Sequence, residues 1–176
     1  MQYVNSCDLE HRFADEVPEE LRAETIDDET FEWKIKRVPS NAWIEELVQH
    51  LPKHFPQPFL SLIQRYRFCN FEVGRIMFFA NTGTDLFYEL SKKVFADPHL
   101  FPTMHKNGLL EFGKPFTGDY DPICFDMKRE HRRDAPIVRL DHEEILINRR
   151  IHVVEEIAPS LNAFMQRAIA EKLKVR

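Results

Sequence analysis

The sequence predicts an α+β domain in which a mixed, largely antiparallel sheet is flanked by short helices, with a C-terminal helix packed on the sheet. Short apolar runs typical of strands alternate with segments of helical spacing. No unit of about 30 residues repeats as a doubly wound α/β fold would require. The length of 176 residues fits about one domain.

The first half of the chain predicts one strand and two short helices. Residues 31–38 alternate large and charged side chains, as a half-buried strand does. Ser40 or Asn41 can cap a helix whose apolar positions recur at spacings of three and four and which ends before Pro52. A second short helix follows the proline-rich linker, because Pro58 is tolerated in a first turn.

The second half predicts a strand, a helix, a three-stranded meander and a final helix. Residues 75–81 are apolar and lie between two glycines, which favours a strand. Residues 85–95 carry an apolar stripe of helical spacing, with Thr82 or Thr84 as its cap. A last helix follows Ser160. We expect residues 108–145 to be the β-core, because three short apolar runs are separated there by turn residues: 109–113, 122–127 and 136–141.

The composition is that of a folded cytoplasmic protein. Hydrophobic residues make up 43% of the chain, and the fifteen Phe predict a core of phenyl rings with some left for an interface, so we expect a monomer or a weak homodimer. No apolar run reaches the roughly 18 residues of a membrane span, and the first residues lack the order of a secretion signal. The three cysteines are widely spaced, so we expect Cys69 and Cys124 to be buried thiols without disulfide or zinc.

The acidic residues gather at the N-terminus. Residues 1–32 contain eleven Asp or Glu and two Arg, a charge of −9, whereas the other 144 residues carry eighteen acids and twenty-two Lys or Arg, a charge of +4. We expect residues 1–30 to be an acidic leader, mobile or helical, and residues 31–176 to be a single domain. The leader is either only solvated or attracts a basic protein partner, and it argues against direct nucleic-acid binding.

No motif for catalysis is present. The DHEE run of residues 141–144 and the carboxylates of Asp119, Asp121 and Asp126 form the densest polar group. Consecutive strand residues point to opposite faces, so a strand-ending turn is favoured over a metal site. The chain has no GxxxxGKS/T, GxGxxG or GxSxG motif, and the basic run at 128–133 is interpreted as a solvated turn. We therefore expect no catalytic residue, cofactor or metal.

The segment GLLEFGKPFTGDYDPICFDM, followed by APIVRLDHEEI and IAPSLNAFM, resembles the SUKH superfamily, which includes the fungal cell-wall glucan-synthesis regulators. Residues 51–68 resemble the family's upstream region, whereas residues 69–74 depart from it. The residues that carry the main resemblance are Phe112, Gly113, Gly118, Asp119, Cys124, Phe125, Asp126, Val138, Asp141, His142, Glu143, Ser160 and Phe164. The resemblance implies an α+β fold without enzymatic activity or cofactor, and bacterial members that bind and neutralise a toxin.

These observations define the functional hypothesis. The chain is expected to be a non-enzymatic immunity protein that binds a toxin, for example a nuclease. The alternatives are a regulatory scaffold of the cell-wall-synthesis-regulator type and a metal-assisted hydrolase using His142. The expected partner-binding residues are Asp119, Tyr120, Asp121, Asp141, His142, Glu143, Glu144, Glu19, Glu20, Asp27 and Asp28. The expected structural motif consists of Phe112, Gly113, Gly118, Phe125 and Asp126.

Overall fold

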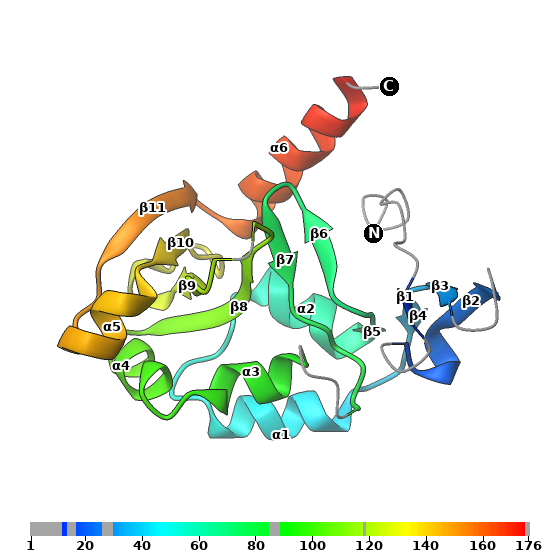
Figure 1. Cartoon of the computed structure of the whole chain (residues 1–176), viewed down its shortest axis with the longest axis horizontal. Coiled ribbons are helices and arrows are strands. Elements are labelled where there is room, and N and C mark those ends of the chain that lie inside the picture. Colours follow the sequence, from blue (N-terminus) through cyan, green and yellow to red (C-terminus); the bar gives the residue numbers. More distant parts are fainter. Residues whose placement is uncertain (1–11, 14–16, 26–29, 85–88, 118, 175–176) are drawn as a thin grey trace.

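A six-stranded antiparallel sheet is the centre of the molecule (Figure 1). The computed structural model describes residues 12–13, 17–25, 30–84, 89–117 and 119–174. The strand order is β11-β10-β9-β8-β7-β6. The strands are β6 (Phe71–Val73), β7 (Ile76–Phe78), β8 (Leu109–Pro115), β9 (Ile123–Asp126), β10 (Ile137–Leu140) and β11 (Val153–Ala158).

Helices flank this sheet, and two small sheets lie beside it (Figure 1). The α-helices of the described chain are α1 (Ala42–His50), α2 (Gln57–Arg65), α3 (Leu90–Ala96), α4 (Leu100–Lys106), α5 (His142–Asn148) and α6 (Leu161–Lys174). The small sheets contain β1 (Arg12–Phe13), β3 (Thr30–Trp33) and β2 (Arg22–Thr25) in one, and β4 (Lys36–Arg37) and β5 (Tyr66–Arg67) in the other. Single turns of 3-10 helix are η2 (Glu19–Leu21) and η3 (Met127–Arg129). The predicted α+β class is confirmed.

The predicted meander is confirmed, because β8, β9 and β10 are antiparallel neighbours and Phe125 pairs with both Leu110 and Ile137. The helices expected after Asn41, from Pro58 and after Ser160 are also present. α3 begins at Leu90, and the start of the helix predicted for 85–95 falls outside the described residues.

Two local predictions were wrong. The single strand expected over 31–38 is divided between two sheets, because Trp33 enters the core at 1% exposure and Lys36–Arg37 pairs instead with β5. The turn expected at 141–144 is the start of α5. The Asp141 carboxylate accepts a hydrogen bond from the Glu144 amide at 3.0 Å, which is an N-cap, so the chain enters a helix directly after β10.

Phenylalanine rings hold the helices to one face of the sheet. Phe59 of α2 lies 5.4 Å from Phe112 and 5.2 Å from Phe125, measured between ring centroids. Phe112 and Phe125 stack on each other at 4.1 Å. Phe164 of α6 stacks on Phe78 of β7 at 6.3 Å, so the C-terminal helix packs on the sheet as predicted. The core is therefore built from phenyl rings contributed by separate elements.

Gly113 allows β7 and β8 to approach each other closely. It pairs with Phe78 in the ladder, and a Cβ at this position would lie 2.5 Å from the backbone oxygen of Met77. Any larger residue would push the two strands apart. Gly118, the other glycine of the expected motif, lies outside the described residues.

The opposite face of the sheet carries a smaller apolar cluster that α4 and α5 cover. Its buried members are Met104, Leu109, Cys124, Val138, Leu140 and Ile145. Cys69 lies in the main core, and both it and Cys124 are buried free thiols, as predicted. α4 was not predicted. The Asp97 carboxylate accepts hydrogen bonds from the amides of His99 and Leu100 there and starts the helix.

Part of the acidic N-terminal segment belongs to the packed structure. Val17 is 1% exposed and Leu21 is fully buried, and both belong to the main core. The backbone oxygen of Leu21 accepts a hydrogen bond of 2.8 Å from the Lys34 amide. None of the helices in the described ranges is long and apolar enough to cross a membrane.

Glu111 gives the fold a testable dependence on pH. This half-buried residue of β8 lies near Lys93 and Asp97, and burial raises the pKa of its carboxyl group from 4.5 to about 8. The folded chain therefore keeps a proton that the unfolded chain releases, and stability falls as the pH rises from 4.5 towards 8.

We predict that the wild-type free energy of unfolding falls by about 2 kcal/mol between about pH 6.5 and about pH 8.5 and that Glu111→Gln removes this loss. Urea unfolding at both pH values measures it. This pH range avoids the titration of His105. Burial lowers the pKa of His105 to about 4, so protonation of this residue destabilises the fold only in acid. An equal loss in the variant and the wild type would contradict this prediction.

Candidate functional site

Two segments predicted to bind a partner meet at one corner of the molecule. We define the corner as residues 119–121, in the loop between β8 and β9, and residues 141–144, at the start of α5. Asp121 Oδ1 lies 2.8 Å from His142 Nδ1 and accepts a second hydrogen bond from the His142 amide at 3.2 Å. Asp121 thus fastens the loop to the helix.

The outer surface of the corner carries an aromatic ring and carboxylates. Tyr120 is 78% exposed, and its ring stands edge-on to His142 at 6.0 Å. Asp119 and Glu143 are exposed, whereas the Glu144 carboxylate accepts a hydrogen bond from Asn148 within α5. This combination of a large ring with free acids is suited to contact with another protein.

Asp141 supports the corner from inside. Its Oδ1 caps α5 through the Glu144 amide, and its Oδ2 lies 3.5 Å from His152 Nδ1. The hydrogen bond from the Glu144 amide is the main cause that lowers the pKa of Asp141, and the interaction with His152 adds to it. The residue is therefore a helix cap whose charge is stabilised at neutral pH.

The polar groups of the corner bond to one another rather than converge on a point. Asp126 lies at the other end of β9, away from the corner. It accepts hydrogen bonds there from the Lys128 amide and from Arg129 Nε, the latter at 2.7 Å. Within the part of the chain that the structure describes, no three His, Cys, Asp or Glu side chains are grouped to hold a metal ion. The Asp121–His142 pair resembles the base and orienting acid of a catalytic triad in geometry alone.

The acids of the N-terminal segment do not join the corner. Figure 1 places β2, which follows Glu19 and Glu20, at the opposite end of the molecule from α5. Glu20 forms ion pairs with Lys36 at 3.0 Å and with Arg67, and these bonds lower its pKa. Asp27 and Asp28 lie outside the described residues. The expected surface of leader plus corner is thus divided.

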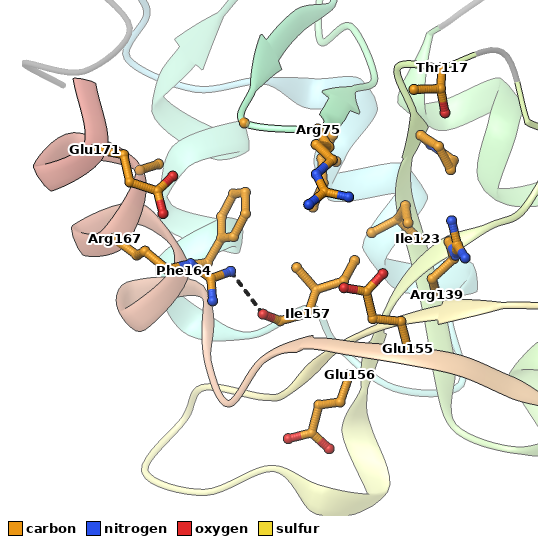
Figure 2. A pocket seen from close by; sticks show the side chains of 14 residues that line it. Arg75, Thr117, Ile123, Arg139, Glu155, Glu156, Ile157, Phe164, Arg167 and Glu171 are labelled. Atoms are coloured by element: carbon orange, nitrogen blue, oxygen red, sulfur yellow. Dashed lines mark hydrogen bonds between the residues drawn. The ribbon is translucent and has the colours of Figure 1, made fainter. Parts of the chain in front are cut away.

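A groove that the sequence did not indicate adjoins the corner (Figure 2). It lies between α6 and the end of the sheet and has a volume of about 430 Å³. Arg139 belongs to both features, because it lines the groove and its Nε lies 3.7 Å from Asp121 Oδ2. The floor is apolar and is formed by Ile76, Ile123, Ile157 and Phe164.

Seven large hydrophobic residues are exposed in the described part of the chain. They lie in the loop after β8, in α5, in β11 and in α6. Tyr120 at 78% and Ile147 at 76% are the most exposed. The full set is Phe116, Tyr120, Leu146, Ile147, Val153, Val154 and Ile169.

We predict that Asp121→Ala lowers the free energy of unfolding by about 1–2 kcal/mol, because the variant leaves the His142 amide and ring without their acceptor. Asp119→Ala is the matched control. Among the described residues its side chain bonds only to Thr117 Oγ1 on the surface, so we expect a change within about 0.5 kcal/mol. Urea unfolding measures both, and equal effects would show that Asp121 does not fasten the corner.

Comparison with known proteins gives no relative from which function can be transferred. No protein-family model, curated protein or solved structure matches this chain. The SUKH resemblance stays a prediction.

Proposed function

We propose that this chain is a non-enzymatic, cytoplasmic protein-binding domain of the immunity type, which neutralises a toxin by covering part of its surface. The observation that carries the proposal is the exposure of large hydrophobic side chains in the two elements of the corner, Tyr120 in the loop and Leu146 and Ile147 in α5. Large apolar side chains exposed near one another can mark a place where another protein binds.

Tyr120 and Ile147 are the anchors of the proposed interface. At 78% and 76% exposure, each has nearly its whole side chain available for burial by a partner. Exposed aromatic residues contribute strongly to binding when a partner buries them, because they bring a large area at a small cost in rotamer entropy.

The exposed carboxylates of Asp119 and Glu143 add charge beside these anchors. Such groups steer a basic partner and set the rate of association more than the final affinity. The ion pairs of Glu20 favour a structural role for that acid, so the proposed docking surface is the corner rather than the leader.

The arrangement of the corner also supports a role without catalysis. Asp121 holds the ring of His142, and Asp141 caps α5 and contacts His152. Each of these groups has a structural role that explains its position.

Co-expression with the proteins encoded by neighbouring genes tests the proposal. We expect one neighbour to be toxic by itself and this chain to restore growth. Tyr120→Ser with Ile147→Ser should abolish the rescue, since the variant removes both anchors from the surface without changing the core. Glu45→Ser with Gln49→Ser, at exposed positions of α1, is the matched control and should rescue fully.

The absence of any toxic neighbour would contradict the immunity role and favour a regulatory scaffold. Rescue by the Tyr120 and Ile147 variant would contradict the proposed surface. Circular dichroism of both purified variants confirms that they are folded.

A further inference from the structure

The groove beside α6 has the size of a site for a small ligand. Its volume of about 430 Å³ lies within the range of small-molecule pockets, roughly 300–1,000 Å³. Its lining comes from the turn between β6 and β7, from the ends of β8 to β11 and from α6 (Figure 2). The elements that form it are held by the core, so the site exists before any ligand binds.

Two guanidinium groups reach this space with unused hydrogen-bonding capacity. The Arg75 side chain forms no hydrogen bond or ion pair with any described residue. Arg139 also lines the groove, and its buried Nε forms an ion pair with Asp121 Oδ2 at 3.7 Å that is too long for a hydrogen bond, so its terminal nitrogens are the groups that can face a ligand. Figure 2 shows both side chains pointing into the groove from different sides. They are suited to binding one carboxylate.

Glu155 brings a negative charge to the same space. Its carboxylate points into the groove in Figure 2, without an ion pair to any described residue. Glu156 points away and is paired with Arg129 at 2.7 Å, because successive residues of a strand face opposite sides. The groove therefore presents sites for an anion and for a cation within one small volume.

The apolar floor lies next to these charges. Ile123, Ile157 and Phe164 line the groove beside the two arginines and Glu155 (Figure 2). A ligand that satisfies all three features carries a carboxylate, an ammonium group and an apolar side chain. A chain terminus offers only one of the two charges, whereas a free amino acid offers both.

We infer that the groove binds a free α-amino acid with an aliphatic or aromatic side chain. Its carboxylate is held by Arg75 and Arg139, its ammonium group by Glu155, and its side chain by the apolar floor. This binding activity goes beyond the proposed toxin-binding function and does not depend on it, because none of these residues is an anchor of the docking surface.

Titration of the full chain with L-leucine and L-phenylalanine, followed by amide chemical shifts in NMR spectra, tests the inference. We expect saturable shifts at residues of the groove. N-acetyl-L-leucine lacks the cation and L-leucinamide lacks the carboxylate, so each should bind about tenfold more weakly than L-leucine.

Variants test each contact separately. Arg75→Gln should lower the affinity for L-leucine about tenfold. The matched control, Arg37→Gln, removes an exposed arginine of β4 and should leave the affinity unchanged. Glu155→Gln should lower the affinity for L-leucine to that for N-acetyl-L-leucine and leave the affinity for N-acetyl-L-leucine unchanged.

Three outcomes would overturn the inference. They are the absence of saturable shifts for both amino acids up to their solubility, equal binding of L-leucine and its two derivatives, and unchanged binding by the Arg75→Gln variant. The same variants are also tested for rescue from the toxin, and we expect all of them to rescue normally. A failure of amino-acid binding is therefore distinguished from a failure of the proposed toxin-binding function.

Discussion

The packing of Phe59 against the rings of the central strands is the contact on which the rest of the structure depends. It joins α2 to Phe112 and Phe125, which themselves stack at 4.1 Å, and Phe78 lies within the same cluster. Closely packed rings fix the positions of the elements relative to one another, because such an interior leaves few voids. α2 covers one part of the sheet face, and the groove beside α6 remains open at the end of β8 to β11.

The corner follows from the same arrangement. β10 ends beside β9, so Asp141 caps α5 close to the point where Asp121 precedes β9. The hydrogen bonds from Asp121 to His142 then fix the loop that exposes Tyr120. Arg139 lies in β10, two residues before Asp141, and links this polar cluster to the groove. A single rigid sheet end therefore carries the proposed docking surface and the proposed amino-acid site side by side.

The sequence predicted the features that depend on local periodicity. Short apolar runs separated by turn residues indicated β8 to β10, and Pro58 in a first turn after the proline-rich linker indicated α2. It also singled out the polar residues of the corner, although it predicted a turn at 141–144 where Asp141 caps α5. β11 was missed because Val153 to Glu156 are all exposed and show no alternation of burial. The groove was missed because its walls come from distant segments, and the charge of the leader gave no sign that Val17 and Leu21 pack in the core.

Substitution of Phe59 by alanine tests the central claim most directly. If this ring unites the fold, urea unfolding followed by tryptophan fluorescence shows one transition and a loss of about 3–5 kcal/mol. Phe101→Ala is the control, because this half-buried ring packs on Phe95 outside the central cluster and its removal costs less. A loss below about 1 kcal/mol, or a loss no larger than that of Phe101→Ala, would contradict the account.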